Sequence, residues 1–504
     1  MNIKKLFGLL LLVVLLASAT TWETTFAKSS VHEPPIRAKG AASSLIIGVP
    51  FEDAGNVQNA GVIDTILGVN SWGLRTDASA NTYYSQATDN ADTVEQGDIY
   101  GRAVVSGDFD GNDYYDIAIG VPGENNWMGA VNVIFFFSDR SIIQTITLED
   151  SIIKQGAQAG DGFGSALVAG DFDGDGRDDL AVGAPGYDND KGAVAILYGN
   201  YEALFYGEDI FAGKDGERFG SALARADFDA NGIYDLVVGS PGAGVGSSQP
   251  DYSGKVTVFY GPLDNIFVPR AMWTQSSTGQ GVSEPDDQFG ASLATGDFNS
   301  DGRTDLAIGV PGEDRGSVKD TGAINILYND HHDLSKTGAK VLFINPTHEG
   351  NRTGFSLAAG DFDNDGSDDL AIGSPYVDYN GVADAGRVDV IWGTPTNRGM
   401  TTLVPPDNRT QYMGYSLAAG DFSGFGFDSL VMGTPGYSSP GHSEDGAVLI
   451  SLGSSDGLRP DPYIITQNDL KVTAAEDFDY FGYSLAVWPV HRYRSVLFTP
   501  VILH

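Results

Sequence analysis

The sequence predicts an all-β fold, a seven-bladed β-propeller closed by pairing of the N- and C-terminal strands in one blade. Three observations lead to this prediction. A unit recurs six times at intervals of 56 to 70 residues, each unit holds several short apolar runs, and the chain ends carry two parts of a further unit. Several short strands per repeat, with no helix between them, are typical of propeller blades.

One copy of the unit shows its order. Residues 163–167 lead into the acidic segment 170–176, residues 179–186 follow, and a second apolar run covers residues 192–199. The first acidic residue of this order stands at Asp108, Asp171, Asp227, Asp297, Asp361 and Asp421. The apolar runs are four to eight residues long, contain Val, Ile and Tyr, and are bounded by Gly, Pro and Asp, a pattern that favours strands. A stacked solenoid is the competing repeat architecture, but its periods are usually shorter.

The chain ends predict how the ring closes. Residues 45–50 match the second strand of a unit and residues 61–68 match the third, with no first strand before them. Residues 481–486 match a first strand, with Pro489 where the first acidic residue would stand. We therefore expect one blade to combine both ends. Residues 495–500 faintly resemble another second strand, which leaves a frayed or duplicated closure as an alternative.

The expected organisation begins with an export signal. Lys4 and Lys5 precede an apolar run over residues 6–16, and Ala17-Ser18-Ala19 is a small-x-small cleavage pattern. An uncleaved anchor is the alternative. We expect a signal peptide at 1–19, an N-terminal extension at 20–43 and the propeller at 44–504, with units at about 100–138, 163–199, 219–261, 289–328, 353–393 and 413–453, and a closing blade from 44–94 plus 481–488. No later stretch predicts a membrane span, so we expect a protein that is secreted or held at the cell surface.

Composition excludes several classes of function. The 504 residues carry 29 Lys and Arg against 67 Asp and Glu, a formal charge of −38, which argues against binding a nucleic-acid backbone. The absence of cysteine excludes disulfides, thiolate metal sites and cysteine nucleophiles.

Acidic loops between the first and second strands predict metal sites. Oxygen-bearing side chains stand at loop positions one, three, five and nine, usually with Gly at position six, and calcium takes six to eight oxygen ligands. The five complete sets are Asp108, Asp110, Asn112 and Asp116; Asp171, Asp173, Asp175 and Asp179; Asp227, Asp229, Asn231 and Asp235; Asp297, Asn299, Asp301 and Asp305; and Asp361, Asp363, Asp365 and Asp369. Position seven, which would offer a backbone carbonyl, is Tyr114, Arg177, Ile233, Arg303 or Ser367. We expect about five structural Ca²⁺ sites.

The acidic loops have three alternative interpretations: an EF-hand, a solvated turn without an ion, and a Mg²⁺ site. An EF-hand needs a bidentate Glu at position twelve and flanking helices, but position twelve is Ile119, Val182, Val238, Ile308 or Ile372. Solvated Asp/Gly turns without an ion are the simpler alternative, and Mg²⁺ is disfavoured because it usually keeps several waters. Asp113 replaces Gly in the first loop. The sixth loop, with Asp421, Ser423, Phe425 and Ser429, should not bind an ion.

The units resemble FG-GAP repeats, the blades of the integrin α-subunit propeller. The Phe-Gly and Gly-x-Pro elements are, for example, Phe163-Gly164 with Gly183-Ala184-Pro185, and Phe289-Gly290 with Gly309-Val310-Pro311. The resemblance covers about residues 44–488 and implies a seven-bladed propeller with calcium in hairpin loops on one face and partner-binding loops on the opposite face. It also implies that the residues of the five acidic loops hold the metal.

These observations predict an integrin-like adhesion or ligand-binding module, expected to be a monomeric propeller that binds an extracellular protein or carbohydrate. The alternative is a hydrolase or lyase acting on polysaccharides or phosphodiesters from its upper loops, since a similar propeller accompanies the catalytic domain of glycosylphosphatidylinositol-specific phospholipase D. No catalytic motif supports it, and His331-His332-Asp333, expected between blades, lacks a third zinc ligand. Candidate contact residues are Trp72, Tyr83, Tyr84, Trp127 and Trp273, and candidate glycosylation sites are Asn351 and Asn408.

Overall fold

The structure is a computed structural model that describes residues 43–54, 56–69, 73–74, 81–86, 93–137, 141–147, 158–201, 203–244, 251–262, 269–344, 348–393, 399–470 and 475–488. The predicted signal peptide 1–19, residues 20–42 of the predicted extension, Trp72 and residues 489–504 lie outside the described residues.

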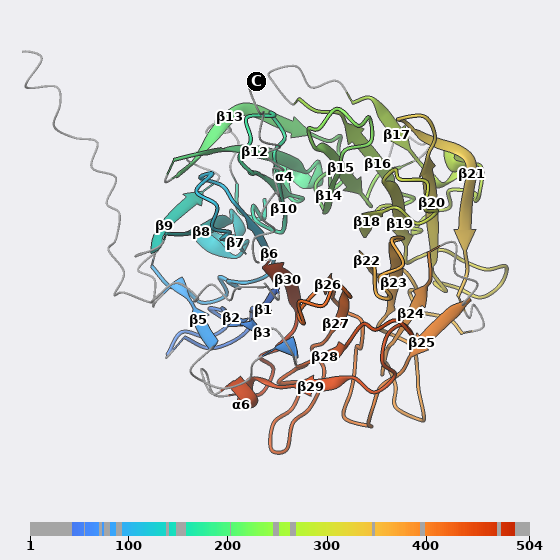
Figure 1. Cartoon of the computed structure of the whole chain (residues 1–504). Coiled ribbons are helices and arrows are strands. Elements are labelled where there is room, and N and C mark those ends of the chain that lie inside the picture. The colour runs from blue at the N-terminus through green and yellow to red at the C-terminus, as the bar shows by residue number, and fades with distance from the viewer. Residues whose placement is uncertain are drawn as a thin grey trace, which may run out of the picture.

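Seven four-stranded antiparallel sheets are arranged in a ring, which confirms the predicted β-propeller (Figure 1). In chain order we number these sheets as blades 1 to 7. The strands of each blade are given from the inside of the ring outward. Blade 1 has β30 (Ser484–Trp488), β1 (Ser44–Val49), β2 (Val62–Ile66) and β5 (Asn81–Tyr84); blade 2 has β6 (Val104–Gly107), β7 (Asp116–Val121), β8 (Ala130–Phe136) and β9 (Ser141–Thr147); blade 3 has β10 (Ala166–Gly170), β11 (Asp179–Ala184), β12 (Ala193–Asn200) and β13 (Ala203–Ala212); and blade 4 has β14 (Ala222–Ala226), β15 (Asp235–Ser240), β16 (Lys255–Phe259) and β17 (Ala271–Trp273). Blade 5 has β18 (Leu293–Gly296), β19 (Asp305–Val310), β20 (Ala323–Asn329) and β21 (Leu334–Leu342); blade 6 has β22 (Ser356–Gly360), β23 (Asp369–Ser374), β24 (Arg387–Ile391) and β25 (Met400–Leu403); and blade 7 has β26 (Leu417–Gly420), β27 (Ser429–Thr434), β28 (Ala447–Ser451) and β29 (Tyr463–Ile465).

Elements outside the blades are small. β3 (Gly68–Val69) and β4 (Gly73–Leu74) form a two-stranded ladder, and the described helices are four residues long: α3 (Glu124–Trp127), α4 (Tyr187–Asp190), α5 (Gln275–Thr278) and α6 (Gln467–Leu470). Within the described residues no helix is both long and apolar enough to span a lipid bilayer.

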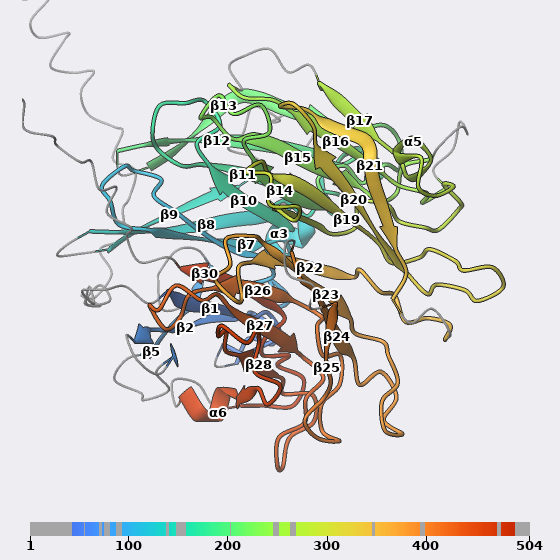
Figure 2. The same ribbon diagram turned by 45° about the vertical axis from the view of Figure 1, so that its right-hand side comes forward.

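The second strand of each blade is buried on both faces, which explains its continuous apolar sequence. Every residue of β11 is buried, and the same holds for β15 and β19. Each blade packs one face against the preceding blade and the other against the next, as Figure 2 shows for the successive sheets. After its first residue, an aspartate in β11, β15 and β19, a central strand therefore carries apolar or small residues at successive positions rather than at alternate ones.

Both chain ends contribute to blade 1. β30 pairs with β1 in antiparallel register from Ser44 opposite Trp488 to Gly48 opposite Ser484. The innermost strands also contact one another around the ring, including β26 with β30 and β30 with β6. The last described strand thus bridges blades 7 and 2 while carrying β1 on its outer edge.

Close contacts between blades account for the recurring glycines. Gly220 of blade 4 has a φ of 88°, and a Cβ on Gly183 of blade 3 would lie 2.1 Å from its carbonyl oxygen. A parallel bridge joins Gly192 to Phe219 at the same junction, and equivalent bridges join the next units. A side chain at Gly183 or Gly220 would push the two blades apart. The glycines of the Gly-x-Pro and Phe-Gly motifs are therefore required for packing between blades.

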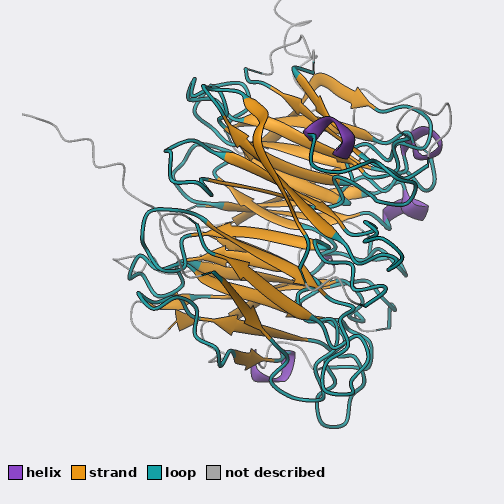
Figure 3. Cartoon of the chain, turned by 90° about the vertical axis from the view of Figure 1, so that its right-hand side faces the viewer, coloured by secondary structure: helices purple, strands orange, loops and turns teal. Residues whose placement is uncertain are grey.

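Antiparallel connectivity gives the ring two distinct faces. The first-to-second and third-to-fourth strand connections lie at one end of each blade, and we call this end the lower face. The second-to-third connections and the links to the next blade lie at the other end, the upper face. Figure 3 shows loops on both sides of the strand layer. The acidic loops are on the lower face, since each joins a first strand to a second.

Candidate functional site

Each acidic loop is a hairpin built on its position-one aspartate. In blade 3, Asp171 accepts hydrogen bonds from the backbone N–H of Gly174 at 2.7 Å and of Gly176 at 2.9 Å. Gly176 at position six has a φ of 91°, and Asp113 takes the same left-handed conformation in blade 2, with a φ of 70°. The replacement of Gly by Asp in the first loop therefore does not prevent the turn.

The position-nine aspartate of each hairpin accepts two backbone hydrogen bonds. Asp179 accepts hydrogen bonds from the backbone N–H of Phe172 at 2.8 Å and of Gly199 at 2.9 Å. Phe172, at position two, is fully buried. The equivalent carboxylates Asp116, Asp235, Asp305 and Asp369 each accept the same two kinds of backbone bond. Each carboxylate oxygen has a second lone pair that these bonds leave unused.

Four of the five hairpins bring three carboxylates together. In each set one oxygen atom per residue lies within 4.8 Å of the others: Asp108, Asp110 and Asp116; Asp171, Asp173 and Asp179; Asp227, Asp229 and Asp235; and Asp361, Asp363 and Asp365. The blade 5 hairpin has Asn299 at position three, and its carboxylates Asp297, Asp301 and Asp305 do not form such a set among the described residues. Its backbone bonds match the others, with Gly302 N–H donating to Asp297 at 2.8 Å.

Positions five and seven are joined by a hydrogen bond in each of the five loops. The backbone N–H of Tyr114, Arg177, Ile233, Arg303 and Ser367 donates to the side-chain oxygen of Asn112, Asp175, Asn231, Asp301 and Asp365, respectively. The Arg177 guanidinium also contacts Asp175 at 2.5 Å, and Arg303 contacts Asp301 at 3.3 Å. These two partly buried arginines partly neutralise the position-five carboxylates of blades 3 and 5.

Burial raises the pKa of the position-nine carboxyls. Desolvation is the largest cause for each, and neighbouring loop aspartates raise it further. The pKa rises to about 8 for Asp179 and to about 7 for Asp235, Asp305 and Asp369, and for Asp116 it lies well above the ordinary value. A cation among these groups would favour their ionised form. The donor set, all oxygen and rich in carboxylate, fits a hard divalent cation such as Ca²⁺.

The position-twelve residues exclude the EF-hand arrangement. Ile119, Val182, Val238, Ile308 and Ile372 are fully buried in the second strands, so they provide no ligand to the loop. The His331-His332-Asp333 segment joins β20 to β21 within blade 5, which corrects its expected position between blades. The His331 side chain is 88% exposed, and Asp333 accepts a hydrogen bond from the Tyr260 hydroxyl.

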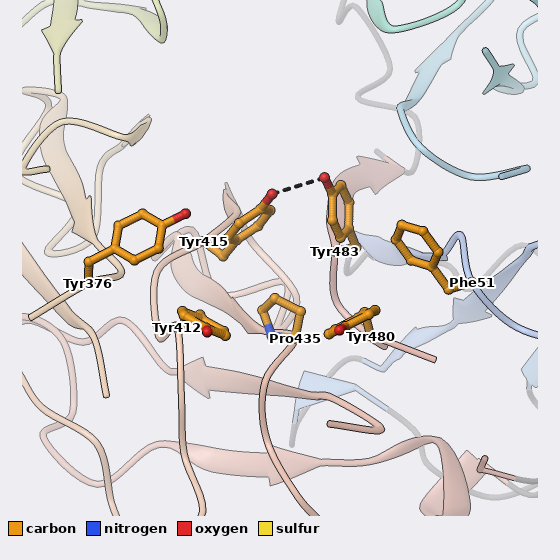
Figure 4. Close-up of a pocket in the computed structure, with 7 residues that line it drawn as sticks. All are labelled: Phe51, Tyr376, Tyr412, Tyr415, Pro435, Tyr480 and Tyr483. Carbon is orange, nitrogen blue, oxygen red and sulfur yellow. Dashed lines mark hydrogen bonds between the residues drawn. The ribbon is translucent and has the colours of Figure 1, made fainter. Parts of the chain in front are cut away.

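A second candidate site is an aromatic pocket on the upper face. It has a volume of about 300 Å³ and is lined by Phe51, Tyr376, Tyr412, Tyr415, Pro435, Tyr480 and Tyr483 (Figure 4). These residues come from the second-to-third connections and from the links that lead into β26 and β30. Blades 6, 7 and 1 therefore contribute to one hollow.

The rings of the pocket support one another. Tyr415 and Tyr483 have centroids 4.9 Å apart, and the Tyr415 hydroxyl donates to the Tyr483 hydroxyl at 2.9 Å (Figure 4). The ring centroids of Phe51 and Tyr480 are 5.3 Å apart, and those of Tyr376 and Tyr412 are 5.8 Å apart. The Arg102 guanidinium also contacts the Tyr483 hydroxyl and lies 4.6 Å from its ring centroid.

The pocket residues were not among the sequence candidates. Tyr84 is 7% exposed and packs near Phe136 between blades, and Trp273 packs in the core shared by blades 4 and 5. Tyr83 is half-buried in β5, whereas Trp127 is 52% exposed on α3. Two signals could have identified the pocket: an aromatic after Gly-x-Pro, as in Tyr376, and a tyrosine after the Phe-Gly glycine, as in Tyr483.

The two predicted glycosylation sites differ in exposure. Asn408 is exposed, but Asn351 is only 2% exposed and stands beside the fully buried Thr353. A glycan needs an exposed asparagine, so the structure argues against Asn351 as an acceptor in the folded protein.

Five segments of the chain match a known protein-family model. The FG-GAP repeat model matches residues 100–133, 163–197, 219–259, 289–327 and 353–397. The chain contains FG-GAP repeats. Its repeats cover blades 2 to 6 in this comparison, and blades 1 and 7 have the same four-stranded construction.

The chain is similar to two kinds of curated protein. Integrin alpha-PS2 of Drosophila melanogaster is 32% identical over 245 residues, which cover 45% of this chain and 16% of that protein. Phosphatidylinositol-glycan-specific phospholipase D of Mus musculus is 38% identical over 162 residues, which cover 30% of this chain and 18% of that protein. The chain thus matches less than a fifth of each relative. Among solved structures, an Agrocybe aegerita lectin described as recognising non-reducing terminal N-acetylglucosamine aligns with a TM-score of 0.48 at 12% identity, over 92% of this chain and 99% of the lectin.

Proposed function

We propose that the protein is an extracellular, calcium-stabilised binding module whose ligand occupies the aromatic pocket of the upper face. The observation that carries this proposal is the pocket itself, in which six aromatic side chains from three blades surround one hollow. Concave, mostly apolar pockets with a few polar groups are typical ligand sites. The similarity to integrin α chains supports an adhesion-like role.

The lower-face hairpins would hold structural calcium. Positions one, three and nine supply the inner carboxylates, position five an outer carboxylate or amide oxygen, and position seven a backbone carbonyl. The bound ion would supply positive charge that offsets the repulsion among the carboxylates. Ion binding to the folded state alone also stabilises that state by mass action.

The pocket chemistry suits a protein or carbohydrate ligand. Aromatic faces offer apolar contact to sugar rings and to ligand side chains, and the phenol groups of Tyr412 and Tyr480 add hydrogen-bonding capacity. Burial raises the pKa of Tyr415 and Tyr376, and it raises that of Tyr480 to about 12, with Glu444 adding to the shift. The phenols are therefore neutral at physiological pH, and the Tyr480 hydroxyl donates to Glu444 at 2.9 Å.

The proposed function also includes export of the protein and the extent and oligomeric state of its propeller. We propose that residues 1–19 are a signal peptide, that the propeller covers residues 44–488 and that it acts as a monomer. Mass spectrometry of the N-terminus of the exported protein, and its molar mass by light scattering, test these points. Retention of residue 1, or a dimeric mass, would contradict them.

A hydrolase or lyase is the second candidate, because the chain is 38% identical over 162 residues to part of phosphatidylinositol-glycan-specific phospholipase D. The lining of the aromatic pocket contains no carboxylate, histidine or lysine that could act as a general base. Its tyrosines with raised pKa values stay protonated at neutral pH, so they are not available as general bases. This chemistry favours binding over turnover at the pocket.

A ligand array tests the proposed function. Glycans and extracellular-matrix proteins are screened with and without Ca²⁺, using the wild type, Tyr412→Ala, Tyr480→Ala and a control, Tyr463→Ala, in which the exposed residue of β29 is removed. We expect saturable binding that both pocket variants weaken at least tenfold and the control leaves unchanged. Equal binding by all four proteins, or product formation from polysaccharides or phosphodiesters, would overturn the proposal.

A further inference from the structure

A second type of acidic cluster lies on the upper face, between blades 1 and 2. Carboxylate oxygens of Glu95, Asp98 and Glu124 lie within 4.8 Å of one another. Glu95 and Asp98 belong to the link between the two blades, and Glu124 follows β7 in the connection to β8. Asp98 is 1% exposed and Glu124 is 2% exposed. This cluster is separate from the hairpin loops, which occupy the lower face.

Two buried amide side chains at the same junction have unused polar atoms. Gln86 is 2% exposed, and its Nε2 donates to Glu124 Oε2 at 2.7 Å, which places the amide against the cluster. Among the described residues, Gln86 Oε1 has no hydrogen-bond partner. Asn132 is fully buried on the face of β8 that it shares with Ile134, which packs with Tyr84 and Tyr100 in this junction. Neither its Oδ1 nor its Nδ2 finds a partner among the described residues.

The same combination recurs at two other junctions. Between blades 4 and 5, the fully buried Gln275 donates to Glu313 at 2.5 Å, and its Oε1 also has no partner in the described part of the chain. Between blades 7 and 1, Gln467 donates to Glu52 at 2.6 Å. The residues equivalent to Glu95, Asp98 and Asn132 are Glu284, Asp287 and Asn325 at the first of these junctions, and Glu476, Asp479 and Asp64 at the second. The glutamine–glutamate contact is therefore a repeated feature of these junctions, and among the described residues the junction between blades 1 and 2 is the one that brings three carboxylates within 4.8 Å of one another.

The junction between blades 3 and 4 shows what such a site needs. Glu217 stands two residues before Phe219, as Asp98 stands two residues before Tyr100. Its carboxylate contacts the Lys255 ammonium at 2.8 Å. Here the chain supplies its own cation to the buried carboxylate. By contrast, Asp287 and Glu313 form no ion pair with lysine or arginine among the residues that the structure describes.

We propose that the junction between blades 1 and 2 binds a divalent cation through Glu95, Asp98, Glu124 and the Gln86 amide oxygen. Carboxylate and amide oxygens are the ligands that Ca²⁺ prefers. Half a turn of the Gln86 amide exchanges its nitrogen and oxygen at the carboxylate, so the group can serve Glu124 as a donor and a cation as a ligand. The ion would join the outer end of blade 1 to blade 2, a role that the hairpin sites, each within one blade, do not have.

Counting ions by native mass spectrometry tests this proposal on the full chain. The protein is equilibrated with Ca²⁺, and bound ions are counted for the wild type, Asp98→Asn, Glu95→Gln and a control, Glu217→Gln, which alters the junction that uses Lys255. We expect Asp98→Asn to bind one ion fewer, Glu95→Gln to lose the same ion at a Ca²⁺ concentration at least tenfold higher than the wild type does, and the control to bind as many as the wild type.

Glu95 is exposed, so its variant should fold even if Asp98→Asn does not. Near-ultraviolet circular dichroism checks the fold of each variant. Folded Glu95→Gln and Asp98→Asn proteins with the wild-type ion count and affinity would overturn the proposal and indicate that ordered water, rather than a cation, satisfies Gln86 and Asn132. Loss of an ion in the Glu217→Gln control would also overturn it, because the effect would not be specific to this cluster.

Discussion

The hairpins of blades 3 and 7 have the same backbone framework but different side chains. Asp421 accepts the backbone N–H of Gly424 and of Gly426, each at 2.7 Å, as Asp171 accepts those of Gly174 and Gly176. Phe422 is as fully buried as Phe172. Position nine differs, because Gly199 N–H donates to Asp179 at 2.9 Å, whereas Gly453 N–H lies 3.4 Å from the Ser429 hydroxyl.

Most of the residues that would bind the metal are not needed to form the turn. A position-one aspartate, a buried position-two phenylalanine and left-handed residues at positions four and six are enough to form the hairpin, as blade 7 shows. The additional carboxylates at positions three, five and nine in blade 3 are therefore not required by the turn. They bring like charges together, a cost that a bound cation would offset.

Removing calcium should have the largest effect. Each ion adds about 2.7 kcal/mol when free Ca²⁺ exceeds the Kd a hundredfold, and ions in five blades contribute together. We expect EGTA to lower the melting temperature by about 10 °C or more, as measured by calorimetry at constant ionic strength. An unchanged melting temperature would show that the carboxylates of blades 2 to 6, like the serines of blade 7, do not stabilise the fold by binding calcium.

The calcium-free protein should become less stable as the pH rises. Burial raises the pKa of Asp235, Asp305 and Asp369 from 3.8 to about 7 and that of Asp179 to about 8. Between these values the folded state holds more protons than the unfolded state, so the free energy of unfolding falls from about pH 4 to about pH 8. Urea denaturation in EGTA at several pH values measures this.

The same protons must leave when calcium binds. We therefore expect Ca²⁺ addition at pH 7 to release protons, which titration calorimetry in buffers of different ionisation enthalpy detects. Blade 7 has Ser429 in place of the titrating residue and adds nothing to this release. A free energy of unfolding in EGTA that rises steadily from pH 4 to pH 8 would contradict the assignment of protonated carboxyls.

A single-site variant should remove one ion. Asp173→Asn keeps an oxygen at position three but lowers its charge, and we expect a loss of about 2.7 kcal/mol in saturating Ca²⁺ and a far smaller change in EGTA. Ser423→Ala alters the same position of blade 7 and serves as the matched control. Equal sensitivity of the two variants to calcium would remove the distinction between the hairpins.

Restoring the blade 7 hairpin should have the smallest effect. A protein that combines Ser423→Asp, Phe425→Asp and Ser429→Asp has the side-chain oxygens of blade 3 on a backbone that already forms the turn. We expect one additional bound Ca²⁺ and a calcium-dependent gain of about 1–3 kcal/mol. Native mass spectrometry gives the ion count, and no gain would mean that backbone position, and not only side-chain identity, differs between the hairpins.

Features encoded by local repetition were predictable from the sequence. The seven blades, the hairpin positions and the lost oxygens of blade 7 follow from order within one unit, as with Asp171 and Asp179. Features that combine separate units were not predictable. Phe51 and Tyr480 line one pocket only because the ring closes, and Gln86 reaches Glu124 across a blade junction. The buried position of Asn351 likewise depends on packing between blades.

Anomalous scattering from crystals soaked in Tb³⁺, a heavier mimic of Ca²⁺, shows directly whether the acidic hairpins bind a cation. We expect peaks within the hairpins at residues 108–116, 171–179, 227–235, 297–305 and 361–369, and none at residues 421–429. A map without peaks at the first five hairpins would contradict calcium binding by these loops, and a peak of equal height among Asp421, Ser423 and Ser429 would contradict the role of the additional carboxylates.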